Sequence, residues 1–261
     1  MGLFEDMNLF GDVATNHRGD KNIFLSLCHE VLVAGAIPKV QLYNEQTFPR
    51  AWAPLLDFKF VSSVFRPADV DFILPYNPLA LKVASVESTY WELIKRCCQE
   101  NLPLIISTGG MDEDELGELL GIAGDHPGLC LMHCVSLYPT PKESINLGRL
   151  ARLSEDLECD DNITIGWSSH YPVVAPAAFA LAWAWGATQF EVHVRPAGLN
   201  HREPLEFLQM TLDEQCAFAP NHLRIIRGLL ESFSILEGFD DYAGPDRDFV
   251  VQHRARWQHE D

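Results

Sequence analysis

Short runs of β-favouring, mostly apolar residues recur along the chain, and segments with the apolar spacing of helices separate them. The runs expected to form strands are Gly11–Ala14, Lys39–Tyr43, Phe58–Ser62, Leu81–Ala84, Leu104–Ser107, Leu129–Cys134, Ile163–Trp167 and Gln189–Val194. Strands that alternate with helices are typical of βα units and of a parallel sheet. Eight such units in 261 residues close most simply into one (β/α)8 TIM barrel, a fold of the α/β class.

The helical spacing also predicts how the barrel begins and ends. An amphipathic helix is expected over Lys21–Ala34, and two further helices over Pro204–Gln215 and Asn221–Phe233 would close the barrel. We therefore expect one barrel domain over residues 1–240 and a C-terminal tail over residues 241–261.

Polar residues cluster where several predicted strands end. The segment Leu131–Pro141 is the most marked case, because its apolar beginning gives way to His133, Ser136 and Tyr138 before two prolines stop the strand. Catalytic groups of β/α barrels lie at the carboxyl ends of the strands. This segment is therefore expected to lead into a site-bearing loop.

Composition limits the classes of partner. A hydrophobic content of 47% is enough for a sizeable core, and 19 basic against 37 acidic residues give a net charge of −18. Such a charge disfavours nucleic acid and anionic membranes, so an anionic substrate would need a local positive site. Seven cysteines without metal-finger spacing, no cationic leader and no apolar run of about 18 residues predict a soluble, cytoplasmic protein with reduced thiols.

One motif resembles the sialic acid synthase (N-acetylneuraminate synthase) family. It is the sequence His-Cys-Val-Ser-Leu-Tyr-Pro-Thr-Pro, followed by Asn146-Leu147. Members of that family condense phosphoenolpyruvate with an aldehyde sugar. Similar family motifs occur at Lys39–Gln41, Phe60–Phe65, Lys82–Glu87, Ser107–Met111, Ser168–His170 and Glu191–His193. The resemblance implies a TIM barrel, a metal-assisted transferase that forms a C–C bond, and a product that is a 2-keto sugar acid.

The resemblance implies that two lysines and a set of serines bind phosphoenolpyruvate. These residues are Lys39, Ser63, Lys82, Ser85, Ser107, Ser136 and Ser168. The residue types suit the task, because an ammonium and a hydroxyl three residues apart, as at Lys82 and Ser85, can bracket a carboxylate or a phosphate. The glycines that follow Ser107 let backbone N–H groups approach an oxyanion closely.

The residues expected to bind the aldehyde substrate match the family's motifs less closely. Asp12 stands where the family has a glutamate that handles protons, and Gln41, Glu87 and Tyr138 would face the aldehyde. Compared with the family, we expect the segment after Gln41 and the loop after Val194 to be shortened and the C-terminal antifreeze-like domain to be absent. We therefore expect N-acetylmannosamine to be a poor substrate, and a different aldehyde, a homodimer or a partner protein to complete the pocket.

Two histidines at the ends of adjacent predicted strands, His170 and His193, could share one divalent ion. A histidine at a strand end is also often purely structural. The resemblance favours the metal, with Mn²⁺ ahead of Mg²⁺ or Co²⁺, and gives Asp12, His170 and His193 the catalytic roles. Ser169 replaces an aspartate of the family, which removes a carboxylate that could orient His170.

Two alternatives stay open at this point. One is a barrel lyase or aldolase that accepts a different partner. The other is a noncatalytic homologue that binds phosphoenolpyruvate or another anion, which Asp12, Ser169 and the missing loops favour. Substrate-dependent release of phosphate would separate an active synthase from both.

Overall fold

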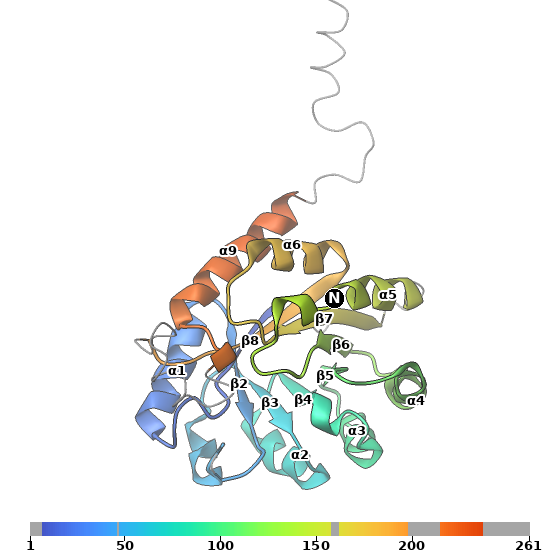
Figure 1. Cartoon of the computed structure of the whole chain (residues 1–261). Helices are drawn as coiled ribbons and strands as arrows, with labels where there is room; N and C mark the ends of the chain where they lie inside the picture. Colours follow the sequence, from blue (N-terminus) through green and yellow to red (C-terminus); the bar gives the residue numbers. More distant parts are fainter. Residues whose placement is uncertain (1–6, 46, 158–161, 198–214, 237–261) are drawn as a thin grey trace, which may run out of the picture.

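The computed structural model describes residues 7–45, 47–157, 162–197 and 215–236. Its strands form a closed parallel barrel in sequence order, and the last strand pairs with the first (Figure 1). The strands are β1 (Leu9–Asp12), β2 (Ile37–Gln41), β3 (Val61–Val64), β4 (Ala80–Val83), β5 (Leu104–Ser107), β6 (Leu129–Cys134), β7 (Ile163–Ser169) and β8 (Ala187–His193). The predicted (β/α)8 barrel is confirmed.

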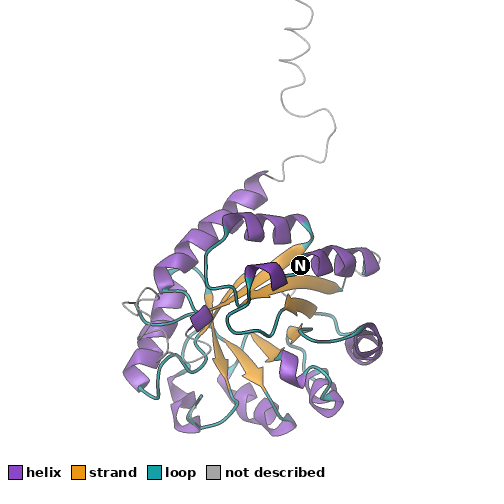
Figure 2. Ribbon diagram, viewed as in Figure 1, coloured by secondary structure: helices purple, strands orange, loops and turns teal. Residues whose placement is uncertain are grey.

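The helices lie outside the ring of strands, as Figure 2 shows. They are α1 (Lys21–Val33), α2 (Pro67–Ile73), α3 (Trp91–Cys97), α4 (Glu113–Ala123), α5 (Gly148–Asp156), α6 (Pro176–Ala184) and α9 (Pro220–Leu236). Short 3₁₀ helices η1 (Arg50–Leu55), η2 (Leu74–Tyr76), η3 (Ser85–Glu87) and η4 (Lys142–Ser144) lie in the connections.

The helices predicted near the two ends of the barrel can be compared with the structure in part. The helix predicted over Lys21–Ala34 is α1, which Asp20 caps by accepting hydrogen bonds from two backbone N–H groups. The helix predicted over Asn221–Phe233 is α9. Nearly all of the segment 204–215, the domain boundary at residue 240 and the tail 241–261 lie outside the described residues and stay predictions.

The first strand begins and ends two residues earlier than its predicted range of Gly11–Ala14. Ala14 has a φ of +43°, and its N–H donates to the Asp12 carboxylate over 3.0 Å, so the backbone turns away from the sheet. At the other end, Leu9 pairs with Phe190 of β8. The ends of β1 therefore depend on its pairing with a neighbouring strand. The sequence of the segment alone could not show this pairing.

The interior of the barrel changes character along its axis. Its amino end is filled by an apolar plug of Met7, Phe10, Val61, Ala80, Ile105, Cys130 and Met132. The larger apolar core lies between the strands and the helices. Because the plug closes one end, a ligand can enter only at the carboxyl ends of the strands.

The described cysteines are all unpaired, and most are buried, as predicted for reduced thiols. Burial raises the pKa of the Cys130 thiol to about 12, so this thiol stays protonated at neutral pH. Among the described residues, no helix combines the length and the apolar character needed to span a bilayer.

Candidate active site

A cavity of about 160 Å³ opens at the carboxyl end of the barrel. Its lining is mostly polar and consists of Asp12, Lys39, Gln41, Lys82, Ala84, Ser85, Val86, Ser107, Cys134, Ser136, Tyr138, Ser168, His170, Glu191 and His193. Every predicted site residue except Ser63 and Glu87 is in that lining. Larger cavities of about 320 and 640 Å³ lie between α4 and α5 and between α1 and α9, and they contain none of these residues.

Four buried charged side chains alternate in sign across the floor of the cavity. The Lys39 Nζ atom lies 2.9 Å from Asp12 Oδ2 and 3.3 Å from Glu191 Oε1, and Lys82 Nζ lies 3.2 Å from Glu191 Oε2. Burial disfavours charge on Lys39, but the two carboxylates outweigh burial and raise its pKa. Burial likewise acts against the charge on Glu191, but Lys39 and Lys82 lower its pKa. Lys39 and Glu191 are therefore both ionised at neutral pH.

Asp12 has further donors that fix its carboxylate. Gln41 Nε2 donates to Oδ2 over 2.7 Å, and the N–H of Ala14 donates to Oδ1. The register of the sheet places Asp12 opposite Lys39, with Gln41 two residues further along β2. The three residues predicted separately from their motifs thus form one contact group.

The serine hydroxyl groups of the cavity contact Glu191, Gly109 and Cys134. Ser168 Oγ donates to Glu191 Oε1 over 3.3 Å. Ser85 Oγ accepts from the N–H of Gly109 over 3.2 Å and lies 2.9 Å from Cys134 Sγ. A Cβ atom on Gly109 would come within 2.6–2.7 Å of Cys134, Ser136 and Ser85. Only glycine therefore lets the backbone come this close to the serines.

The imidazoles of His170 and His193 are neighbours, with ring centroids 5.2 Å apart. His170 Nδ1 lies 2.9 Å from the carbonyl oxygen of Val135, which favours a proton on Nδ1 and leaves Nε2 with a free lone pair. Burial, and then the neighbouring His193, lower the pKa of His170 to about 3, so this ring is neutral at neutral pH. Tyr138 stacks on His170 with ring centroids 4.0 Å apart.

His193 Nδ1 is buried without a hydrogen-bond partner in the described structure, and its distance to Asp12 Oδ2 is 3.5 Å. Among the described residues, no cluster of three or more His, Cys, Asp or Glu side chains could hold a metal ion. The two imidazoles therefore fit a divalent ion only if water or substrate oxygens complete its coordination shell.

Two predicted site residues are not in the cavity lining. Ser63 is buried beneath Lys39 and accepts a hydrogen bond from its Nζ over 3.1 Å. Glu87 is half-buried in η3, and burial raises its pKa. The structure places Ser63 one contact away from the cavity and Glu87 beside it, so their predicted contacts with substrate stay predictions.

Glu191 and Cys134 line the cavity, although neither was assigned a role from the sequence. A usable signal existed for Glu191. Side chains two residues apart on a strand share one face, so Glu191 must point to the same side as His193 on β8. No pattern in the sequence indicated that Glu191 contacts two lysines from other strands.

Comparisons with known proteins identify the family of this chain. The NeuB family model matches residues 39–203. The chain is 34% identical over 135 residues to pseudaminic acid synthase of Campylobacter jejuni, which covers 51% of this chain and 37% of the relative. It is 30% identical to N,N'-diacetyllegionaminic acid synthase of Legionella pneumophila, over 53% of this chain and 39% of that relative. The chain thus spans well under half the length of these two synthases.

A longer match and two solved structures extend the comparison. An uncharacterized protein of Methanocaldococcus jannaschii is 26% identical over 97% of this chain and 79% of its own length. The structure of N-acetylneuraminic acid synthetase from Leptospira borgpetersenii has a TM-score of 0.81 at 19% identity, over 98% of this chain and 94% of the other. That of spore coat polysaccharide biosynthesis protein spsE from Bacillus subtilis has a TM-score of 0.74 at 25% identity, over 88% and 69%. Since the family match covers more than half of the chain, this chain belongs to the NeuB family.

Proposed function

We propose that this chain condenses phosphoenolpyruvate with an aldehyde sugar, or a related aldehyde, to give a 2-keto sugar acid and phosphate. One observation supports the proposal most directly. Two lysines, several serine hydroxyls and two neighbouring imidazoles line one cavity at the carboxyl end of the barrel. Relatives named as pseudaminic and legionaminic acid synthases add support for a synthase of this class.

In this proposal the two lysines hold the anionic groups of phosphoenolpyruvate. Lys39 and Lys82 are nearly fully buried, and charge-assisted hydrogen bonds from buried ammonium groups to a carboxylate or phosphate are strong. Ser85, Ser107 and Ser136 would donate hydroxyl hydrogens to the remaining oxygens. Gly109 keeps the wall of the cavity close enough for these contacts.

His170 and His193 would hold the divalent ion that we propose as cofactor, with Mn²⁺ preferred over Mg²⁺ or Co²⁺. His170 presents Nε2 because Nδ1 is engaged by the Val135 carbonyl, and the partnerless Nδ1 of His193 is a second candidate ligand atom. When bound, such an ion polarises an aldehyde oxygen. Stacking by Tyr138 would keep the His170 ring in its orientation.

The bonds and protons of the reaction balance as follows. A new C–C bond forms between C3 of phosphoenolpyruvate and the aldehyde carbon, and water adds to C2. One proton of this water ends on the aldehyde oxygen, which becomes a hydroxyl group. The C2–O bond to phosphate then breaks, the hydroxyl group on C2 becomes the ketone, and its proton leaves with the phosphate. Asp12 would accept the proton of the attacking water at its carboxylate, which Lys39 and Gln41 hold in place. Gln41 and Tyr138 would bound the aldehyde side of the cavity.

A phosphate-release assay tests the proposal. The purified chain would be incubated with phosphoenolpyruvate, Mn²⁺ and a panel of aldehyde sugars, and a homodimer or a second protein would be sought if the aldehyde side needs completion. We expect phosphate release with at least one aldehyde, and a kcat/KM for N-acetylmannosamine below about 10⁴ M⁻¹s⁻¹. Binding of phosphoenolpyruvate without phosphate release from any aldehyde would instead indicate an anion-binding homologue.

A further inference from the structure

Glu191 joins the two lysines of the cavity. Its Oε1 lies 3.3 Å from Lys39 Nζ and accepts a hydrogen bond from Ser168 over 3.3 Å, and its Oε2 lies 3.2 Å from Lys82 Nζ. The side chain is 3% exposed. Both carboxylate oxygens therefore contact groups that the proposed function assigns to the binding of phosphoenolpyruvate.

The charges that line the cavity cancel. Among the described lining residues, Lys39 and Lys82 are the only lysines or arginines, and Asp12 and Glu191 are the only carboxylates. The nearby amino end of α4 adds little positive potential, because its first turn carries Glu113, Asp114 and Glu115. Without a ligand, two positive charges thus face two negative ones.

Phosphoenolpyruvate carries a carboxylate and a phosphate group whose charge is about −1.5 to −2 near neutral pH. Moving such an anion into a buried, neutral site is costly unless a positive charge accompanies it. We propose that Glu191 is a positioning residue that spaces Lys39 and Lys82 and cancels one of their charges, so that phosphoenolpyruvate binds tightly only together with a divalent cation at His170 and His193. This inference rests on the proposed function.

Glu191→Gln separates charge from shape. The amide keeps nearly the same volume and one acceptor oxygen for a lysine, but it leaves the four-residue group with one net positive charge. The variant should therefore bind phosphoenolpyruvate better than the wild type when no cation is present. By linkage, the factor by which Mn²⁺ increases the affinity for phosphoenolpyruvate equals the factor by which phosphoenolpyruvate increases the affinity for Mn²⁺.

Calorimetric titration of phosphoenolpyruvate into the full chain, in EDTA and in saturating Mn²⁺, measures this coupling. For the wild type we expect Mn²⁺ to tighten binding at least tenfold. For Glu191→Gln we expect binding in EDTA to be at least tenfold tighter than for the wild type, and the effect of Mn²⁺ to shrink by a similar factor. Glu191→Asp keeps the charge and should keep the dependence on Mn²⁺.

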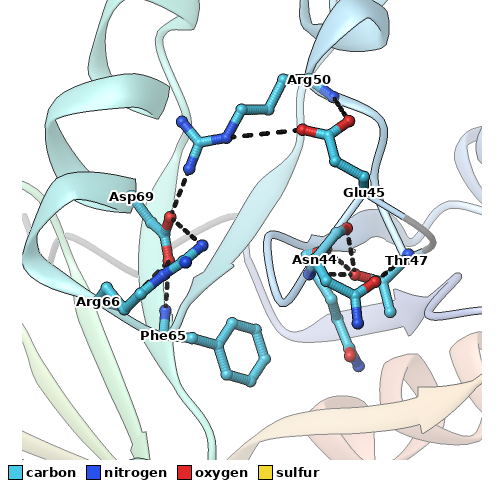
Figure 3. A network of polar contacts seen from close by, with 8 residues as sticks. Asn44, Glu45, Thr47, Arg50, Phe65, Arg66 and Asp69 are labelled. Carbon is cyan, nitrogen blue, oxygen red and sulfur yellow. Dashed lines mark hydrogen bonds and ion pairs between the residues drawn. The ribbon is translucent and has the colours of Figure 1, made fainter.

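Asp69 offers a matched control, because it is another buried carboxylate between two cations (Figure 3). Its Oδ1 lies 2.8 Å from Arg50 Nη2 and 3.1 Å from Arg66 Nη2, and the residue belongs to α2, outside the cavity. Asp69→Asn should leave the affinity for phosphoenolpyruvate within twofold of the wild type under both conditions. If Glu191→Gln does not fold, Asp12→Asn makes the same charge change and should also weaken the dependence on Mn²⁺.

Several outcomes would overturn the inference. One is wild-type binding that Mn²⁺ does not tighten, and another is a Glu191→Gln variant with the wild-type dependence on Mn²⁺. Loss of Mn²⁺ binding by Glu191→Gln in the absence of phosphoenolpyruvate would instead make Glu191 a metal ligand. These results leave the proposed function standing, whereas a wild type that binds no phosphoenolpyruvate even with Mn²⁺ would remove both.

Discussion

His193 shows how a single side chain can be tested for a role in the site. Its ring is buried, its Nδ1 atom has no hydrogen-bond partner in the described structure, and its nearest imidazole is that of His170. We predict that His193→Ala abolishes Mn²⁺ binding and lowers turnover at least 100-fold. The free energy of unfolding should change by less than about 1 kcal/mol, because removing an unsatisfied nitrogen offsets part of the lost packing.

Metal titration and urea unfolding measure the two effects. His133→Ala is the matched control, since His133 lies on β6 outside the cavity and its Nε2 contacts the carbonyl oxygen of Ile145 over 3.1 Å. This variant should lose about 1–3 kcal/mol of stability and keep its affinity for Mn²⁺. Full activity in His193→Ala would refute the assignment of the ligand.

Lys82 carries the second prediction at the residue scale. Lys82→Ala removes a charge-assisted contact to phosphoenolpyruvate and leaves Glu191 less well compensated. We expect the affinity for phosphoenolpyruvate in saturating Mn²⁺ to fall at least tenfold, which corresponds to a loss of about 1.5–3 kcal/mol. Calorimetry would measure the loss, and Lys59→Ala, which changes an exposed lysine, should have no effect.

At the scale of elements, the connection from β5 to α4 packs against residues that line the cavity. Gly109 packs against three side chains, those of Ser85 in η3, Cys134 at the end of β6 and Ser136 beyond it. Gly117, on the exposed face of α4, has no atom within 4 Å of an added Cβ. We predict that Gly109→Ala lowers the affinity for phosphoenolpyruvate at least tenfold, because the added methyl group would collide with Ser85 and Ser136 and displace them. Gly117→Ala should keep the wild-type affinity.

The same pair of variants differs in stability. Gly117→Ala should raise the free energy of unfolding by about 0.5–1 kcal/mol, since alanine loses less backbone entropy in a helix. This gain corresponds to a Tm increase of about 1–4 °C for a chain of this size. Gly109→Ala should lower the Tm. Equal affinities of the two variants for phosphoenolpyruvate would show that this connection tolerates a methyl group.

At the scale of the whole molecule, buried histidines make stability depend on pH. Burial lowers the pKa of His17 and of His133, although each ring lies within hydrogen-bond distance of a carbonyl oxygen. Their folded-state pKa values therefore lie below those of the unfolded chain. Below about pH 6.5 the unfolded chain binds more protons, so stability falls as the pH falls.

We predict that each of these histidines lowers the free energy of unfolding by up to about 1.4 kcal/mol per pH unit below pH 6.5. Urea unfolding at pH 7.5 and pH 5.5, with EDTA present, measures the effect. His133→Asn should show a smaller difference between the two pH values than the wild type. An equal difference would mean that His133 titrates alike in the folded and unfolded chains.

The sequence by itself determined the fold and most of the residues of the cavity. Strand and helix periods are local properties, so the eight strands could be found one at a time, and polar residues at their carboxyl ends marked the open end of the barrel. Motifs similar to those of the sialic acid synthase family added which polar residues to choose. The metal, the aldehyde and the role of each site residue stay predictions.

The tertiary structure alone decided which charges meet. Lys82 and Glu191 are 109 positions apart, and they touch because strands on different sides of the ring point their side chains into one interior. Closure between β1 and β8 likewise brings Asp12 opposite His193. The spacing of residues along a chain holds no information on such distances, because they depend on the closure and stagger of the whole barrel. For this reason the balance of charges around Glu191 became visible only in the folded molecule.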